Sequence, residues 1–193
     1  MTLRKLKYLI AADSAAVVVA TVIVFITFAL INSRFLTRLD IDGIVVAASI
    51  SAITGLGMTL IIAMRALDLS VGSIQGFAAI VAAELFSHGT PLVLVILIGI
   101  AVGGGLGLVN GLLVTGLGLP SFVATLATLS MILGGELLIT QGQTIGLQSS
   151  TFNHLVVGNV FGVVPAAAVE ALVIAVIIWF IFYWDNVLYS QRH

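Results

Sequence analysis

The chain has 193 residues, of which 61% are hydrophobic and 8% charged, and its formal net charge is −1. Because an ordinary soluble domain is about 25% charged, this composition cannot cover a water-exposed surface and predicts an integral membrane protein. The sequence contains no cysteine, which excludes disulfides and thiolate metal sites, and no basic cluster of the kind that binds nucleic acid.

Apolar runs of about 17 to 27 residues recur along the chain, which suits helices that cross a hydrocarbon core of roughly 30 Å and exceeds the length of barrel strands. The predicted fold is therefore all-α, a polytopic transmembrane helical bundle of about six spans that forms one domain over residues 1–193. The first span is expected from Ala15 to Ile31, behind a basic start and an edge at Asp13. We interpret it as an uncleaved anchor rather than a signal peptide, since equally apolar spans follow.

The second span is predicted over residues 44–64, and a stripe of small residues along it favours close helix contact: Ala48, Ala52, Gly55 and Thr59. A polar break, residues 65–72, then precedes a short third span over residues 73–86. Because this span contains Gln75 and Glu84 and is barely long enough to cross, we expect it to be tilted, partly re-entrant or shielded inside the bundle.

The fourth span, residues 92–114, carries a second small-residue stripe whose four-residue spacing predicts a packing face: Gly103, Gly107 and Gly111. The residues that follow predict a hinge, because proline disfavours helix in the preceding residue and is tolerated at a helix start. The hinge residues are Gly116, Gly118 and Pro120.

On the fifth span, residues 121–139, Ser121, Thr125 and Thr128 line one side and apolar residues another. This one-sided polarity predicts a substrate-facing surface, while the open alternative is that the hydroxyls bond to carbonyls one turn back. Glu136 joins the candidate substrate pathway because a charge inside a membrane is expensive. Asn110 joins it as well, with an inter-helix hydrogen bond as its simpler role.

Asp68 and Ser70 lie where the second span ends and the third begins. They are candidates for a gate or a contact with a cytoplasmic partner, or for capping the next helix. Glu84 and Glu170 are expected near the membrane boundary. The scattered histidines, His88, His154 and His193, predict no metal site.

The sequence predicts no catalytic site and no cofactor. Its lysines, Lys5 and Lys7, exclude a P-loop in this chain, so any ATP hydrolysis must take place on another polypeptide.

After a polar segment, Pro165 opens a sixth span over residues 166–184, which ends in an aromatic cluster suited to the lipid–water boundary. Six spans put both termini on one side of the membrane. Placing that side in the cytoplasm puts five basic residues inside and two outside, in line with the positive-inside tendency. Those inside are Arg4, Lys5, Lys7, Arg65 and Arg192, and those outside are Arg34 and Arg38.

Four motifs occur in order: Asp68-Leu-Ser-Val-Gly72, Asn110-Gly-Leu-Leu-Val114, Pro120-Ser-Phe-Val-Ala-Thr-Leu126 with Thr128, and Gly134-Gly135 through Thr140-Gln-Gly142. In this order and spacing they resemble the membrane-spanning permease subunits of bacterial ABC importers for ribose, xylose and related sugars, including the autoinducer-2 branch. The resemblance extends from the basic N-terminus to about Gly142.

The resemblance implies a multi-pass subunit of the bacterial inner membrane with a cytoplasmic N-terminus, which moves a sugar or sugar-like molecule. It implies as partners ABC ATPase subunits, a second permease subunit in a homodimer or heterodimer, a periplasmic or lipid-anchored sugar-binding protein, and membrane lipid. Such permeases continue beyond the sixth span with a segment that docks on the ATPase. Residues 184–193 do not match that segment, so we expect an N-terminal portion of a permease.

Two other functions stay open at this point. One is half of an ion-coupled secondary transporter, with Glu84 or Glu136 titrating at the coupling-ion site. The other is a non-transporting membrane scaffold or truncated remnant.

Overall fold

Six helices and one small hairpin make up the part of the chain that the computed structural model describes, residues 3–146, 158–160, 162 and 164–190. The helices are α1 (Leu3–Ile31), α2 (Arg38–Ala63), α3 (Val71–Ser87), α4 (Leu92–Thr115), α5 (Ser121–Thr140) and α7 (Ala166–Ser190). The hairpin pairs β1 (Asn159–Val160) with β2 (Val164–Pro165) in antiparallel register. The predicted all-α fold is confirmed, and the hairpin is an addition that the sequence pattern did not predict.

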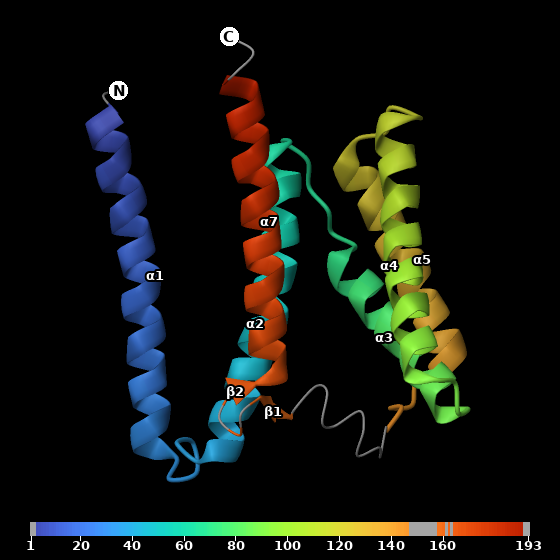
Figure 1. Ribbon diagram of the computed structural model, residues 1–193, viewed down its shortest axis with the longest axis horizontal. Helices are drawn as coiled ribbons and strands as arrows, with labels where there is room; N and C mark the ends of the chain where they lie inside the picture. The colour runs from blue at the N-terminus through green and yellow to red at the C-terminus, as the bar shows by residue number, and fades with distance from the viewer. Residues whose placement is uncertain (1–2, 147–157, 161, 163, 191–193) are drawn as a thin grey trace.

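The helices alternate in direction, so that successive connections lie at opposite ends of the molecule (Figure 1). Both termini lie at the same end, together with the α2–α3 and α4–α5 connections. By length and composition, α2, α4 and α5 are able to cross a membrane. The other helices contribute shorter apolar stretches: Ala15–Ile31, Val71–Ser87 and Ala166–Phe180.

Some helix starts agree with the sequence prediction and others differ from it. Helices α4, α5 and α7 begin where the sequence predicted, at Leu92, Ser121 and Ala166. The apolar stretch expected from Ala15 to Ile31 is present, and α1 extends it back through the basic start to Leu3. The second helix also begins earlier than predicted, at Arg38, where the hydroxyl of Thr37 accepts the first-turn N–H of Asp40 at 3.5 Å.

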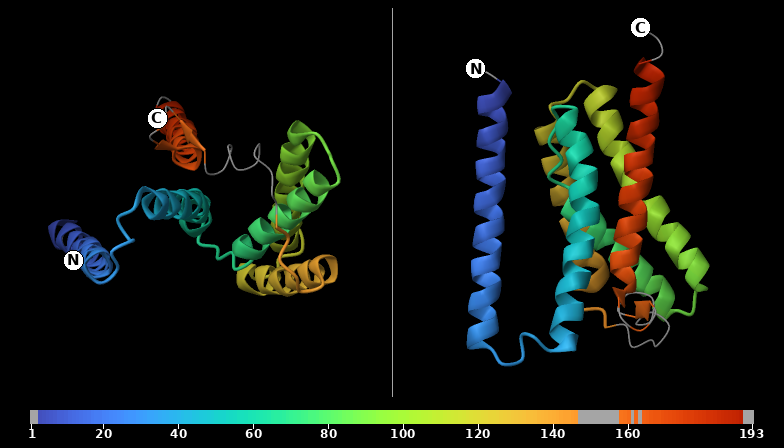
Figure 2. Two further views of the ribbon diagram at one scale, coloured as in Figure 1. Left: turned by 90° about the horizontal axis from the view of Figure 1, so that it is seen from below. Right: turned by 60° about the vertical axis from the view of Figure 1, so that its left-hand side comes forward.

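The helices form two groups of different size and one separate helix (Figure 2). Helices α3, α4 and α5 pack against one another and form one unit. Helix α2 packs along α7, which also contacts the hairpin, and α1 stands apart from both groups. The substantial contacts within the described chain are therefore concentrated in the α3–α4–α5 unit and the α2–α7 pair.

The buried side chains of the described residues are mostly small and polar. Val95, Ala124, Ile132 and Ala167 are the buried hydrophobic residues, whereas six polar residues are equally buried: Ser49, Ser70, Ser73, Asn110, Thr125 and Thr128. Lipid tails are as apolar as leucine, so apolar burial gives helices in a membrane little reason to associate. Close packing and interhelical hydrogen bonds take over that role.

Candidate functional site

The polar break between α2 and α3 lies against the first two turns of α5. After Arg65, which has a left-handed φ of 58°, the chain leaves α2 and runs without helical structure to Ser70. Figure 1 shows this segment descending beside the helices before α3 begins. The polar break is thus non-helical and is followed by the short helix α3, Val71–Ser87. Whether this span is tilted, re-entrant or shielded stays a prediction.

Hydroxyl groups on α5 accept hydrogen bonds from backbone N–H groups of this break. The N–H of Leu67 donates to Ser121 Oγ at 3.1 Å, and the N–H of Leu69 donates to Thr125 Oγ1 at 3.1 Å. Four residues of helix rise about 6.0 Å, close to the roughly 6.6 Å that two residues of an extended chain span. The four-residue spacing of the two hydroxyls therefore matches alternate amides of the break.

A second set of hydrogen bonds joins the break to α4 and α5 at Ser70, whose side chain is fully buried. Asp68 Oδ1 accepts the backbone N–H of Ser70 at 2.7 Å and its hydroxyl at 2.6 Å. Asn110 on α4 donates through Nδ2 to Ser70 Oγ at 2.7 Å and accepts the hydroxyl of Thr128 at 2.6 Å. We call Asp68, Ser70, Asn110 and Thr128 the α3–α5 lock.

The lock shows which hydrogen bonds these residues make, while their roles in a substrate pathway or gate stay predictions. Asn110 makes the inter-helix hydrogen bonds expected of it, and Asp68 accepts the N–H of Ser70 at the start of α3. Thr125 and Thr128 also approach carbonyls one turn back, those of Ser121 at 2.8 Å and Ala124 at 3.1 Å. The one-turn bonds and the inter-helix bonds are therefore both present.

A cavity of about 370 Å³ adjoins the lock, and we call it the Asp68 cavity. Four of the predicted pathway and gate residues line it: Asp68, Asn110, Ser121 and Thr125. Gly107 and Gly111 line it as well, and an added Cβ at either glycine would meet no atom within 4 Å. A Cβ added to Gly103 would lie 3.9 Å from Ile74 Cγ2. The packing role of these glycines stays a prediction.

The predicted hinge forms the connection between α4 and α5. Gly118 has a φ of +68°, a conformation that favours glycine, and a Cβ added to Gly116 would lie 2.7 Å from the carbonyl oxygen of Leu112. Pro120 immediately precedes α5 and its carbonyl accepts the N–H groups of Val123 and Ala124. The connection is thus a tight glycine-dependent turn, and its movement as a hinge stays a prediction.

Glu136 lies near the other end of α5, away from the lock. It lines a second cavity of about 720 Å³, the Glu136 cavity, between the ends of α3 and α5 and residues 142–145. Glu136 Oε1 is buried without a hydrogen-bond partner, and it lies so close to α3 that a Cβ added to Gly76 would be 2.8 Å away. Glu136 is therefore separate from the other predicted pathway residues.

The remaining acidic candidates lie at helix ends. Glu84 is exposed near the end of α3, where its carboxylate is 3.7 Å from Nδ1 of His88. Glu170 is exposed in the first turns of α7. Their place at the membrane boundary stays a prediction. His154 and His193 lie outside the described residues.

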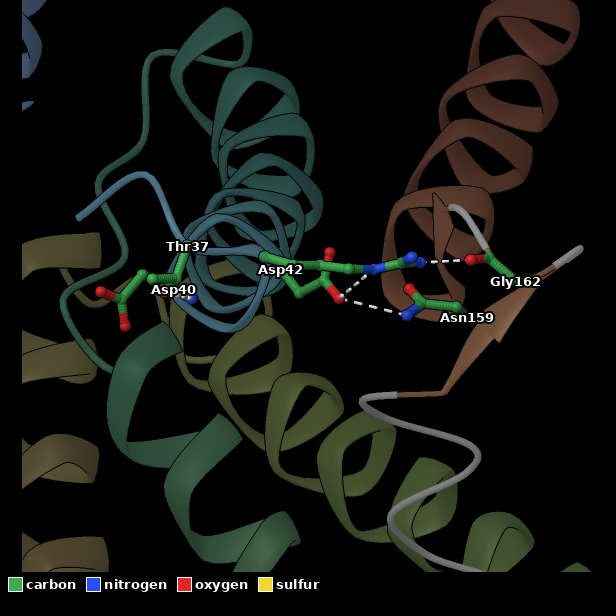
Figure 3. A network of polar contacts seen from close by, with 6 residues as sticks. Thr37, Asp40, Asp42, Asn159 and Gly162 are labelled. Carbon is green, nitrogen blue, oxygen red and sulfur yellow. Dashed lines mark hydrogen bonds and ion pairs between the residues drawn. The ribbon is translucent and has the colours of Figure 1, made fainter. Parts of the chain in front are cut away.

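The sequence analysis missed a polar network between the first turns of α2 and the hairpin (Figure 3). Arg38 donates to the carbonyl of Gly162 and lies 3.7 Å from Asp42, and Asn159 Nδ2 donates to Asp42 at 3.1 Å. These contacts fasten the hairpin, and with it the start of α7, to α2. The four-residue spacing of Arg38 and Asp42 was a signal for the ion pair, but nothing local indicated Asn159 as a partner.

Comparison with known proteins gives one family. The family described as branched-chain amino acid transport system / permease component matches residues 40–187. The D-allose transport system permease protein AlsC of Escherichia coli (strain K12) is 33% identical over 84% of this chain and 50% of its own length. The ribose import permease protein RbsC of Haemophilus influenzae is 30% identical over 84% of this chain and 51% of its own.

A third relative is the autoinducer 2 import system permease protein LsrC of Yersinia pseudotuberculosis (serotype O:3), 30% identical over 90% of this chain and 50% of its own. The chain thus spans about half the length of the curated relatives it matches. No solved structure matches it.

Proposed function

Because the chain belongs to the family of branched-chain amino acid transport system permease components, we propose that it is part of the membrane permease of an ATP-driven importer. The proposed cargo is a sugar or sugar-like small molecule, since the relatives are named for allose, ribose and autoinducer 2 transport. The chain contributes no ATP hydrolysis of its own. Its lysines, Lys5 and Lys7, lie at the N-terminus and offer no phosphate-binding loop.

The observation that best supports transport is the interrupted third span. Non-helical backbone at membrane depth is tolerated only where protein buries it or where it lines a cavity, and discontinuous helices of this kind frequent transporter binding sites. Here the break is held by hydroxyls of Ser121 and Thr125 and borders the Asp68 cavity. A purely structural bundle has no need of this arrangement.

We propose that the lock belongs to the closed part of the pathway. When α3 moves relative to α5, the hydroxyls of Thr125 and Thr128 and the amide of Asn110 would exchange their present partners for water or cargo. The turn from Gly116 to Pro120 would absorb the change in backbone angle, and Asp68 and Ser70 would couple it to a cytoplasmic partner. ATP binding elsewhere drives the change only through unequal contact with the two states.

The proposed assembly contains ABC ATPase subunits, a second permease subunit and a sugar-binding protein outside the membrane. The chain forms one transmembrane domain in the bacterial inner membrane with its N-terminus in the cytoplasm. The lock end then faces the cytoplasm, and the Glu136 cavity and hairpin face outward. The basic residues of the N-terminal segment and Arg65 support this orientation through the positive-inside tendency.

An uptake assay tests the proposal. The chain is expressed with a candidate ATPase, sugar-binding protein and companion permease from the same genome, in cells that lack their own importers for D-ribose, D-allose and L-arabinose. We expect uptake of at least one labelled sugar that requires the binding protein and stops when the ATPase is inactivated. Absence of uptake of all three, with the chain present in the membrane and bound to its ATPase, would contradict the proposed cargo class.

The unpaired oxygen of Glu136 gives a second function some support, that of an ion-coupled transporter. The same assay separates the two. Uptake that persists with an inactive ATPase and collapses when a protonophore removes the proton gradient would favour the ion-coupled mechanism.

A further inference from the structure

The Glu136 cavity has a mixed lining. Its apolar residues are Ala79, Ile80 and Ala83 of α3, Leu133 and Leu137 of α5, and Ile145. Its polar residues are Glu136, Thr140, Gln143 and Thr144. Sites for small molecules have this character, mostly apolar with a few convergent polar groups, and volumes of about 300–1,000 Å³.

Among the residues that the structure describes, Glu136 has no basic partner. Its Oε1 atom is buried against Gly76 and makes no hydrogen bond. Moreover, no lysine or arginine occurs anywhere between Arg65 and Arg192 in the sequence, so α3, α4 and α5 carry none. An ionisable residue within a membrane protein is kept at a cost. Because Oε1 is almost inaccessible, a molecule in the cavity would meet the part of the Glu136 side chain that lines the cavity.

The lining discriminates between kinds of ligand. An anion would meet the acidic Glu136 with no basic residue to offset it. No group of three or more His, Cys, Asp or Glu side chains that could hold a metal ion occurs among the described residues, and an organic cation prefers aromatic walls, which the described lining lacks. A neutral polyhydroxylated molecule fits this mixed lining, because its hydroxyl groups donate to a carboxylate while its C–H face packs on alanine and leucine side chains.

We propose that the Glu136 cavity is a binding subsite for a neutral, hydroxyl-bearing ligand of the sugar class, with Glu136 as the acceptor of its hydroxyl groups. The sugar class rests on the proposed function. In the proposed orientation the cavity lies toward the outer face, where a sugar-binding protein releases its cargo. Gly76 is a positioning residue, since only glycine leaves room for the carboxylate at its present place beside α3.

The absence of cysteine allows a test that does not depend on transport. Thr144→Cys introduces a single thiol at the edge of the cavity, and its alkylation by N-ethylmaleimide is followed in membranes containing the full chain and its partners. We expect D-allose, D-ribose or L-arabinose to slow alkylation in a saturable manner. Combining Thr144→Cys with Glu136→Gln should raise the half-protecting concentration about tenfold, as expected for loss of one charge-assisted hydrogen bond.

Two glycine variants test whether ligand protection depends on where the Glu136 carboxylate lies, and not only on its being there. Gly76→Ala keeps Glu136 but places a Cβ 2.8 Å from Oε1, and it should weaken protection about as much as Glu136→Gln does. Gly72→Ala is the matched control, one turn earlier on α3, where an added Cβ meets no atom within 4 Å. It should leave protection unchanged. Because Gly76→Ala retains the acidic residue, it remains informative even if Glu136→Gln fails to accumulate.

Several results would overturn the subsite. They are alkylation that none of the sugars slows, protection that is the same in the Glu136→Gln and Gly76→Ala variants as in the parent, and protection by sodium chloride or choline chloride instead of sugars. Uptake measured in parallel keeps the two proposals apart. Sugar uptake without protection at Thr144→Cys refutes the subsite and leaves the permease function intact, whereas protection without uptake refutes the transport function and leaves the subsite.

Discussion

The polar groups at the two ends of α5 differ in whether they have hydrogen-bond partners. At the beginning of the helix, the polar atoms of the lock bond to one another, and Ser121 and Thr125 receive the amides of the break. Near its end, Glu136 Oε1 has no partner and lies beside the larger of the two cavities. Satisfied polar groups hold helices together, whereas an unsatisfied one suggests a place for something else.

The difference follows from which residues the neighbouring elements supply. The break brings backbone amides and Ser70 to the beginning of α5, and α4 adds Asn110, so each hydroxyl there finds a complement. The part of α3 beside Glu136 offers Gly76 and Phe77, neither of which has a side-chain hydrogen-bonding group. Helix α5 therefore meets a paired polar cluster near its beginning and carries a buried, unpaired carboxylate oxygen near its end.

Removing the centre of the lock should have the largest effect on stability. Asn110→Ala deletes both the donor to Ser70 and the acceptor for Thr128. We expect the free energy of unfolding in detergent to fall by about 2 kcal/mol, because two buried hydroxyls lose partners. The measurement uses Ala124→Cys, a buried single thiol, and a thiol-reactive fluorophore during heating. A midpoint equal to that of the parent would show that the lock does not stabilise the α3–α4–α5 unit.

Removing a single hydroxyl from α5 should have a smaller effect and should depend on which side of the helix it lies. Thr125→Val keeps the shape of the side chain but leaves the N–H of Leu69 without its acceptor, at a cost of about 1 kcal/mol. Ser130→Ala is the control, since this exposed hydroxyl bonds only to the carbonyl of Leu126 one turn back. The same thermal assay compares them. Equal destabilisation by both changes would mean that the bond to the break contributes nothing.

The sequence predicted the helices better than it predicted their contacts. The starts of α4, α5 and α7 were predictable because proline or a glycine-rich turn precedes them and long apolar runs follow. The polar stripe of Ser121, Thr125 and Thr128 was also visible, since it depends only on helical spacing. What Ser121 and Thr125 bind was not predictable, because their partners are backbone amides some 50 residues earlier, as the pair Leu67 and Ser121 illustrates.

For Glu136, the sequence predicted the residue's importance but not its surroundings. Its presence in an apolar span marked it as a candidate for the substrate pathway. In the structure it lies by itself beside Gly76, because α3 begins part of the way along α5 and its first turns reach the far half of that helix. The position of α3 along α5 depends on the non-helical break. The conformation of the break depends on tertiary contacts, which a local sequence pattern does not reveal.

The smallest expected effect concerns a second glycine contact at the α3–α5 interface. A Cβ added to Gly135 would lie 3.4 Å from Phe77 Cε2, close to an ordinary contact distance, whereas one added to Gly76 would lie 2.8 Å from a carboxylate oxygen. Alanine also suits a helix interior better than glycine, by roughly 0.5–1 kcal/mol. Gly135→Ala should therefore leave the thermal midpoint unchanged or slightly raised, and sugar protection at Thr144→Cys unchanged. If Gly135→Ala abolished protection as Gly76→Ala is expected to, the spacing of the two helices, rather than the position of the Glu136 carboxylate, would control the cavity.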